Sequence, residues 1–257
     1  MTLVLFDKLN PAIGRITLND PDSLNAMSEK MADEFAALVV KLRGDTALRC
    51  LILTGAGRAF SAGGDLEMLE RKTALSAAEN KRLMLKFYDS FLSLLELNVP
   101  LIAAINGHAI GAGLCVACAC DVRIAAVGAK LGFTFTKLGL HPGMGATWFL
   151  PRVVGLAAAT ELVITGRVVE AQDALKMGLV SRVLPADQIM NEVQRVADEI
   201  LQCGPESIAQ VLQSMRNPLP TLRESLVREA DFQSVNYASA QFKEGVRATR
   251  EKRKPSW

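Results

Sequence analysis

The chain has 257 residues, of which 50% are hydrophobic and 22% are charged, so it can bury a substantial core in one large domain or one domain with a small appendage. This composition excludes a disordered or fibrous protein. The 29 basic and 27 acidic residues leave a net charge of +2, which gives no reason to expect a nucleic-acid partner. Residues 247–254 are locally basic, as a solvated helix end can be.

The five cysteines predict no disulfide framework, because their number is odd and three of them cluster in an apolar stretch: Cys115, Cys118 and Cys120. We expect buried free thiols in a reducing, cytoplasmic compartment. The cluster lacks a second Cys/His pair at zinc spacing, so no metal site is expected. The N-terminal residues do not resemble a signal peptide, and no run of about 20 apolar residues predicts a membrane span.

Two short strands and a helix are predicted at the start of the chain. Residues 3–6 and 14–18 read as strands around a turn at residues 10–11. Ser28 is a plausible N-cap for a helix that Gly44 closes. The apolar residues of this helix recur at helical spacing, at Met31, Phe35, Leu38 and Leu42.

Apolar strands then alternate with glycine-rich loops and helices. The strands are predicted at residues 50–54, 101–105 and 121–126, with a fourth cycle that runs toward residues 178–182. The apolar residues of an amphipathic helix between the first two strands are Leu83, Phe87, Phe91, Leu94 and Leu95. From about residue 186 the pattern is helical. The sequence therefore predicts an α/β fold that finishes as a helical appendage.

Two glycine-rich loops, residues 59–66 and 106–114, are the candidate functional segments. A strand that ends in glycines before a helix leaves backbone N–H groups that point at one place. Two such loops on neighbouring strands can direct their N–H groups at one oxygen, as an enolate or a tetrahedral anion requires. One well-placed donor is worth about 3 kcal/mol in such a site. The alternative is that the glycines only permit tight turns.

Motifs for other chemistries are absent. Residues 143–145 (Gly-Met-Gly) lack the third glycine and the later acidic residue of a dinucleotide site. The chain contains neither a phosphate-binding P-loop nor the Gly-x-Ser-x-Gly motif of a serine nucleophile. With two histidines in the whole chain, a Ser/His/Asp protease is not expected.

Ordered motifs along nearly the whole chain resemble the crotonase superfamily, the enoyl-CoA hydratase/isomerase group. The matching segments are residues 23–26, 59–65, 106–113, 120–124, 129–132, 140–143, 150–152, 165–166, 171–174, 178–180 and 251–255. The resemblance implies a crotonase (ClpP-like) spiral of ββα units at residues 1–190. It also implies a C-terminal helical region at residues 191–257 for trimerisation and closure of the CoA site, and a homotrimer or a hexamer of two trimers.

The resemblance further implies an acyl-CoA thioester as substrate, with CoA entering as part of the substrate and no separate cofactor. The backbone N–H groups of Gly64 and Ala112 would hold the thioester oxygen. The other residues expected around the substrate are Ser23, Asn25, Ala26, Ala62, Gly63, Asp65, Leu66, Gly111, Cys115, Phe135 and, through a CoA phosphate, Lys252.

Two catalytic glutamates of the family hydratases are replaced here, by Cys115 and Phe135. Neither side chain can do the acid–base work of a carboxylate. His141 is the best remaining candidate because imidazole titrates near neutral pH, although its ring could instead be held by backbone groups at a helix start. We expect a structural role for His108, a helix-capping role for Asp65, and a buried rather than nucleophilic Cys115.

The expected function is an enzyme that acts on an acyl-CoA by stabilising an oxyanion. Hydration and double-bond isomerisation are the default reactions of the family that the chain resembles, and thioester hydrolysis and decarboxylation are variants. The alternative is a catalytically silent acyl-CoA-binding protein that has kept the oxyanion-binding loops and lost the acid–base pair.

Overall fold

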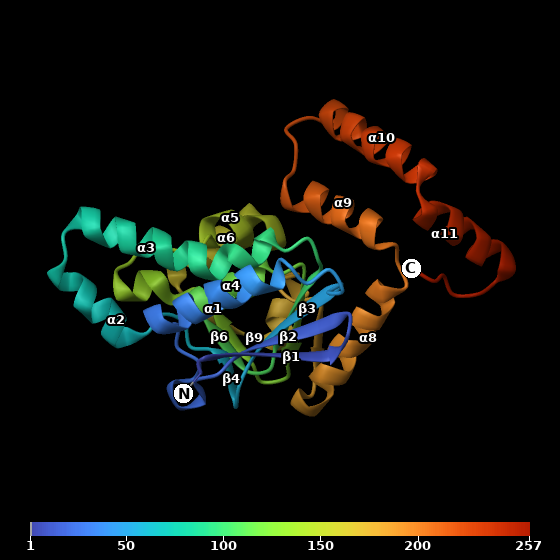
Figure 1. Ribbon diagram of the computed structural model, residues 1–257. Coiled ribbons are helices and arrows are strands. Elements are labelled where there is room, and N and C mark those ends of the chain that lie inside the picture. Colours follow the sequence, from blue (N-terminus) through green and yellow to red (C-terminus); the bar gives the residue numbers. More distant parts are fainter. Residues whose placement is uncertain (1) are drawn as a thin grey trace.

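Two sheets surrounded by helices form the protein in this computed structural model, which describes residues 2–257 (Figure 1). The larger sheet has the order β1-β2-β3-β5-β7-β10 and is parallel except for the β1–β2 hairpin. The smaller sheet has the order β4-β6-β8-β9 and is parallel except for the β8–β9 pair. The strands are β1 (Val4–Asn10), β2 (Ile13–Leu18), β3 (Cys50–Gly55), β4 (Ala59–Ser61), β5 (Leu101–Ile105), β6 (His108–Ile110), β7 (Val122–Ala126), β8 (Lys130–Gly132), β9 (Val168–Glu170) and β10 (Arg182–Leu184).

Successive units of the chain each contribute one strand to the larger sheet and then one short strand to the smaller sheet. The pairs are β3 with β4, β5 with β6, and β7 with β8. β3 and β5 are buried along their whole length, as parallel strands covered on both faces are. Because β3 pairs with β5 and β4 pairs with β6, the loops that follow β4 and β6 leave neighbouring strands at corresponding ends.

Helices cover the sheets and connect these units. α1 begins where the Ser28 hydroxyl accepts a hydrogen bond from the Met31 N–H at 3.2 Å, so the predicted cap is confirmed. It packs against α3 through Phe35 and Phe91, whose ring centroids lie 5.2 Å apart. The helices up to α8 are α1 (Glu29–Leu42), α2 (Leu66–Arg71), α3 (Ala77–Leu92), α4 (Ala112–Ala119), α5 (Ala146–Val154), α6 (Leu156–Thr165), α7 (Ala171–Lys176) and α8 (Ile189–Leu201). No helix within residues 2–257 combines the length and the apolar character that crossing a bilayer requires.

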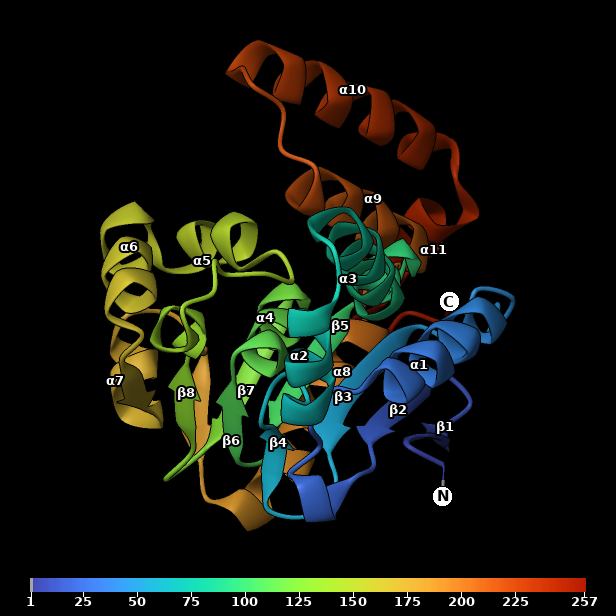
Figure 2. The same cartoon turned by 90° about the vertical axis from the view of Figure 1, so that its left-hand side faces the viewer.

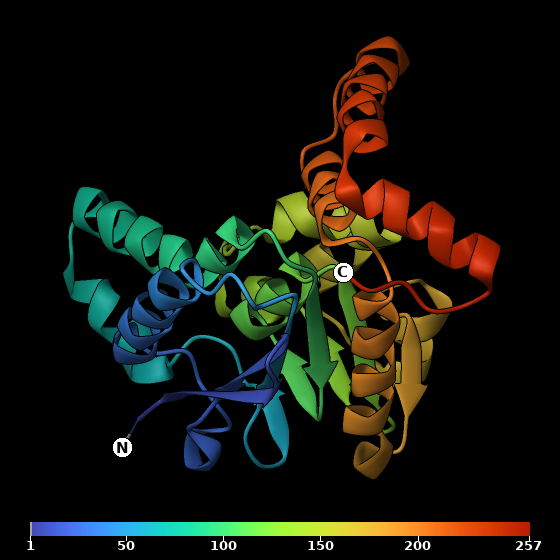
Figure 3. The ribbon, with the colours of Figure 1, turned by 45° about the vertical axis from the view of Figure 1, so that its right-hand side comes forward.

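Three C-terminal helices, α9 (Pro205–Arg216), α10 (Leu222–Ala238) and α11 (Ala240–Glu251), extend away from the sheets (Figures 1 and 3). Arg216, the last residue of α9, fastens them to the core. Its guanidinium donates to both carboxylate oxygens of Asp121, at 2.6 and 3.0 Å, and to the carbonyls of Leu97 and Val99. α10 buries none of its residues in the described chain.

The alternation of strands and helices that the sequence predicts is confirmed, with corrections at the ends of elements. β1 runs to Asn10 instead of ending at residue 6, and the last strand of the larger sheet begins at Arg182. β4 and β6 lie within segments predicted as loops, because strands of three residues are too short to show a periodic pattern. The predicted boundary after residue 190 falls inside α8, which packs against β3, β5 and β7. The extended helices therefore begin with α9.

Candidate active site

A cavity of about 770 Å³ lies among α2, α3, the start of α4 and residues 134–144. Figure 2 views the molecule from the side of α2 and α3. Most of the predicted site residues line this cavity: Ser23, Ala26, Ala62, Gly63, Gly64, Asp65, Leu66, Gly111, Ala112, Phe135 and His141. Asn25, Cys115 and Lys252 are not among its lining residues.

The two glycine-rich loops touch each other at the cavity. Gly63 has φ +94° and Gly111 has φ +53°, both in the left-handed region that favours glycine. A Cβ on Gly63 would lie 2.7 Å from the Ile110 carbonyl oxygen and 3.5 Å from the Ala112 nitrogen. Glycine is therefore required at position 63 both for its backbone conformation and for the close approach of the second loop.

Each loop presents a backbone N–H group with no hydrogen-bond partner within residues 2–257. Ala112 is the first residue of α4, so its N–H lies before the intrahelical hydrogen bonds begin. The backbone groups on either side of the Gly64 N–H are paired, and within the described residues that N–H is not. The Gly63 carbonyl accepts from the Met27 N–H at 2.7 Å, and the Asp65 N–H donates to the Met27 carbonyl at 3.1 Å. Gly64 and Ala112 both line the cavity.

Asn25 supports the first loop from behind instead of facing the cavity. It is fully buried, and its side-chain amide donates to the carbonyls of Ala56 and Ala59 at 2.9 and 2.8 Å. Ser61 continues this support, since its hydroxyl donates to the Asn25 carbonyl at 2.8 Å and accepts from the Gly63 N–H at 3.1 Å. The Asn25 side chain thus has a structural role in this chain.

Cys115 and Phe135, the two replacements for glutamate, offer no acid–base group. Cys115 lies inside α4 with 0% of its surface exposed, and burial raises the pKa of its thiol well above the ordinary range, so the thiol stays neutral. Phe135 lines the cavity close to Gly111. Cys118 and Cys120 are likewise buried and free, as predicted. Within residues 2–257, no three His, Cys, Asp or Glu side chains are grouped so that they could hold a metal ion.

Asp65 contributes the one carboxylate among the lining residues of the described chain. Its side chain accepts a hydrogen bond from the Met68 N–H at 2.8 Å and so caps α2, which confirms the predicted capping role. Glu67 and Glu70, the other acidic residues of α2, do not line the cavity. One oxygen of this carboxylate therefore holds a helix.

His141 is the imidazole of the cavity. Its Nδ1 lies 2.8 Å from the Pro142 carbonyl oxygen, which can only accept, so Nδ1 carries the hydrogen and Nε2 is left as an acceptor. One ring nitrogen is thus held by the backbone, as the structural interpretation of His141 expects, and the catalytic role stays a prediction. His108 lies outside the cavity, and its Nδ1 accepts from the Lys130 N–H at 3.1 Å, consistent with the expected structural role.

Tyr88 is a lining residue that the sequence did not single out. It projects from α3, and a Cβ on Gly143 would lie only 2.3 Å from its hydroxyl oxygen. Burial, and secondarily the nearby Cys115, raise the pKa of Tyr88. The sequence does offer a reason to consider Tyr88, because it is one of two tyrosines in the chain and adjoins Phe87 on a predicted amphipathic helix.

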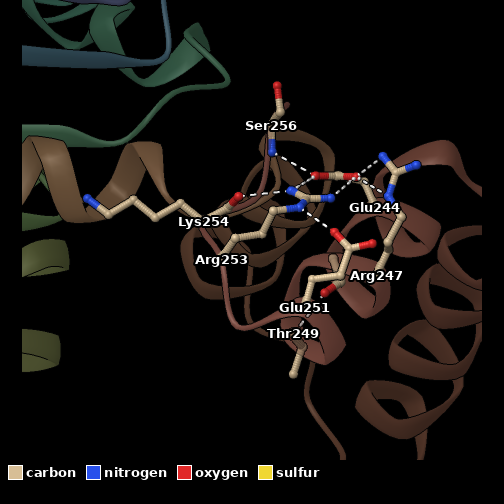
Figure 4. Close-up of polar contacts among 8 residues, drawn as sticks. Glu244, Arg247, Thr249, Glu251, Arg253, Lys254 and Ser256 are labelled. Atoms are coloured by element: carbon tan, nitrogen blue, oxygen red, sulfur yellow. Dashed lines mark hydrogen bonds and ion pairs between the residues drawn. The ribbon is translucent and has the colours of Figure 1, made fainter.

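Lys252 is the C-cap of α11. The tail that follows, with Arg253, Lys254 and Ser256, folds back on that helix (Figure 4). The Glu244 carboxylate anchors the tail by accepting from Arg253 at 2.6 Å, from the Ser256 N–H at 3.0 Å, and from Arg247. Lys252 takes the left-handed conformation of a C-cap, with φ +53°, and its N–H donates to the Thr249 carbonyl at 3.2 Å.

The spiral of paired strands, the C-terminal helices and the glycine-lined cavity together define a protein of the crotonase fold. A crystal structure of enoyl-CoA hydratase from Bacillus anthracis is 32% identical and superposes with a TM-score of 0.93 over 99% of this chain and 98% of that one. The chain belongs to the enoyl-CoA hydratase/isomerase family, whose model matches residues 8–257.

Named relatives cover nearly the whole chain. A probable mitochondrial enoyl-CoA hydratase of Dictyostelium discoideum is 35% identical over 246 residues, which are 95% of this chain and 87% of that protein. The 1,2-epoxyphenylacetyl-CoA isomerase of Escherichia coli is 34% identical over 244 residues, 94% of this chain and 93% of that protein. The protein is therefore an enzyme of this family that acts on an acyl-CoA.

Proposed function

We propose that the enzyme moves a double bond along the acyl chain of an enoyl-CoA by way of an enolate. The Gly64 and Ala112 N–H groups donate to the thioester oxygen as negative charge gathers on it. Support comes from the two unpaired donors on touching loops of one cavity. Each such donor contributes about 3 kcal/mol when it meets the developing charge. The position of Ala112 at the start of α4 adds the positive end of a helix dipole.

A single base is sufficient for this isomerisation, and His141 is that base. Its Nε2 takes a proton from the α-carbon of a 3-enoyl thioester, which leaves a dienolate. The resulting imidazolium returns the proton to the γ-carbon, which yields the conjugated 2-enoyl thioester with no net change in atoms. Hydration would need a second group to activate water, and Cys115 and Phe135 cannot supply it. The observation that carries the proposal is the cavity with two unpaired N–H donors, one imidazole and a single carboxylate, Asp65, that caps α2 through one of its oxygens.

The assay follows the conversion of 3-hexenoyl-CoA to 2-hexenoyl-CoA by the absorbance of the conjugated thioester. We expect His141→Gln to lower kcat by about 100-fold or more, because general base catalysis is lost. The dissociation constant of unreactive hexanoyl-CoA should change less than about threefold, since binding uses other groups. His108→Gln, which alters the other histidine of the chain, is the matched control and should leave both quantities unchanged.

Two outcomes would contradict this mechanism. Wild-type enzyme that binds hexanoyl-CoA without isomerising 3-hexenoyl-CoA would favour the silent acyl-CoA-binding alternative, or hydrolysis or decarboxylation of another thioester.

Isotope-edited infrared spectra of bound hexanoyl-CoA test the two donors separately from the base. Hydrogen bonds from Gly64 and Ala112 should shift the thioester carbonyl band to lower frequency, and an unshifted band would exclude them.

Assembly and CoA binding complete the proposal. We propose a homotrimer, alone or paired as a hexamer, in which the exposed apolar side chains of α10 are covered by another copy. The backbone near Ser23, Ala26 and Leu66 would cradle the adenine and pantetheine parts of CoA, and Lys252 would meet a CoA phosphate. A cytoplasmic location is supported by five cysteines that are all free.

A further inference from the structure

The hydroxyl of Tyr88 is an unpaired hydrogen-bond donor in the wall of the cavity. Tyr88 is half-buried on α3, and its hydroxyl has no hydrogen-bond partner within residues 2–257. The wall around the cavity is otherwise largely apolar, with Met68, Leu69, Met84, Phe87, Leu138 and Met144 among its residues. The hydroxyl faces the open cavity and is not among the fully buried unpaired atoms of the described chain, so water can pair it, and a ligand that displaces this water without offering an acceptor loses free energy.

Gly143 fixes where this hydroxyl lies. Its φ is outside the left-handed region, so the backbone conformation does not require glycine there. Space requires it instead, because a Cβ at Gly143 would lie 2.3 Å from the Tyr88 hydroxyl oxygen and 2.9 Å from the ring carbon that bears it. The phenol is therefore seated against the same loop that carries His141.

The phenol acts as a donor and not as a base. Burial raises its pKa above the ordinary value of about 10, so the hydroxyl keeps its hydrogen throughout the neutral range. A hydrocarbon chain that displaces water from the cavity leaves this donor unpaired. An acyl chain with an oxygen at the matching position pairs it, and sites that can hydrogen-bond a substrate discriminate strongly against analogues that lack the bonding atom.

We propose that Tyr88 is a specificity-determining residue that donates a hydrogen bond to an oxygen atom on the acyl chain. The preferred substrates are then acyl-CoAs that carry a hydroxyl, ether or ketone oxygen beyond the thioester, not plain hydrocarbon chains. This inference rests on the proposed acyl-CoA function of the same cavity.

Calorimetric titration with four unreactive ligands tests the preference: hexanoyl-CoA and its 3-oxo, 4-oxo and 5-oxo forms. We expect at least one oxo form to bind wild-type protein about tenfold more tightly than hexanoyl-CoA. Tyr88→Phe keeps the ring and removes the donor. The affinities of the oxo forms should then lie within about twofold of the hexanoyl-CoA affinity, which should itself be retained. Gly143→Ala should have the same effect, because its Cβ displaces the hydroxyl. Tyr237→Phe, the matched control on exposed α10, should keep the preference.

Three results would overturn the inference. If the dissociation constants of all four ligands for wild-type protein agree within about twofold, Tyr88 does not select for an oxygen on the acyl chain. This holds even if the enzyme isomerises 3-hexenoyl-CoA. A preference that survives in Tyr88→Phe assigns the selectivity to another group. Failure of every ligand to bind overturns the acyl-CoA function of the cavity together with this inference.

Discussion

Asn25 shows how one buried side chain can hold a glycine-rich loop without lining the cavity. Its amide donates to two carbonyls of residues 56–59, and its oxygen accepts from the Asp20 N–H at 2.9 Å. Its own backbone has φ +56°, a left-handed conformation that asparagine tolerates better than most residues. The side chain therefore joins segments about 30 residues apart behind the loop that carries Gly64.

Asn25→Ala should lower the free energy of unfolding by about 3 kcal/mol, because three backbone groups each lose a hydrogen bond to its side chain and the left-handed backbone at this position suits alanine poorly. Urea denaturation followed by circular dichroism measures this change. Asn191→Ala, at an exposed position on α8, is the control and should stay within about 0.5 kcal/mol of wild type. An Asn25→Ala protein that is as stable as wild type but binds hexanoyl-CoA poorly would return Asn25 to the ligand-binding set.

At the scale of residues, local hydrogen bonding was readily predicted. The capping roles of Ser28 and Asp65 depend on a side chain and an N–H group three positions later, so adjacent sequence is sufficient to infer them. The contact between Tyr88 and Gly143 joins residues 55 positions apart, and no local pattern marks it. The loss of the family glutamates at Cys115 and Phe135 was visible in sequence, and the predicted burial of the Cys115 thiol is confirmed.

The tail after α11 is held by ion pairs instead of apolar packing alone. Glu244 receives hydrogen bonds from Arg253, the Ser256 N–H and Arg247, in that order of influence, and these hold its pKa well below the ordinary carboxyl range. A carboxyl whose pKa is lower in the folded than in the unfolded protein stabilises the fold above its unfolded pKa, near 4.5, and loses that contribution as the pH falls further.

We therefore expect the tail to loosen as the pH is lowered from about 4.5. Trp257 reports on it, because a ring carbon of Trp257 lies 3.5 Å from the position of a Cβ on Gly245. The measurement is Trp257 fluorescence between pH 7 and pH 3 in a Trp148→Phe background, with far-UV circular dichroism to follow the rest of the fold. Glu244→Gln should show the loosened spectrum already at pH 7.

The control for this prediction is Glu229→Gln, at an exposed position on α10, which should behave as wild type. If wild-type Trp257 fluorescence is unchanged down to pH 3, or if Glu244→Gln matches wild type at pH 7, the ion pairs do not hold the tail. The prediction belongs to this element, because the Glu244 cluster lies within α11 and the tail that follows it.

α10 leaves the molecule with an apolar surface that its own chain does not cover. Its exposed apolar residues are Leu222, Leu226, Val227, Val235 and Tyr237. Leu222 is 75% exposed, and no residue of the helix is buried within the described chain. Several exposed apolar side chains on a helix that buries none of its residues are typical of association surfaces. Arg216 holds the adjoining α9 to the core and so fixes the direction in which α10 extends.

Light scattering coupled to size-exclusion chromatography tests the proposed assembly of the whole molecule. We expect the wild-type mass to be three or six times that of one chain. The double change Leu222→Glu with Leu226→Glu should shift the protein to the monomer, because it places charges in the apolar interface. Val40→Glu, at an exposed apolar position on α1, is the control and should leave the mass of the assembly unchanged. Monomeric wild-type protein, or equal dissociation of both variants, would contradict an α10 interface.

The amino-acid sequence by itself determined the α/β alternation, the helix caps, the two glycine-rich loops and the missing carboxylates, because these features depend on residue type and on spacings of a few positions. Tertiary structure alone decided that both loops share one cavity, that Asn25 is not among its lining residues, and that Tyr88 is. The physical reason is that parallel strands bring their loops together through pairing between distant segments. The direction in which a side chain faces is settled only when helices such as α3 and α4 pack against those strands and each other.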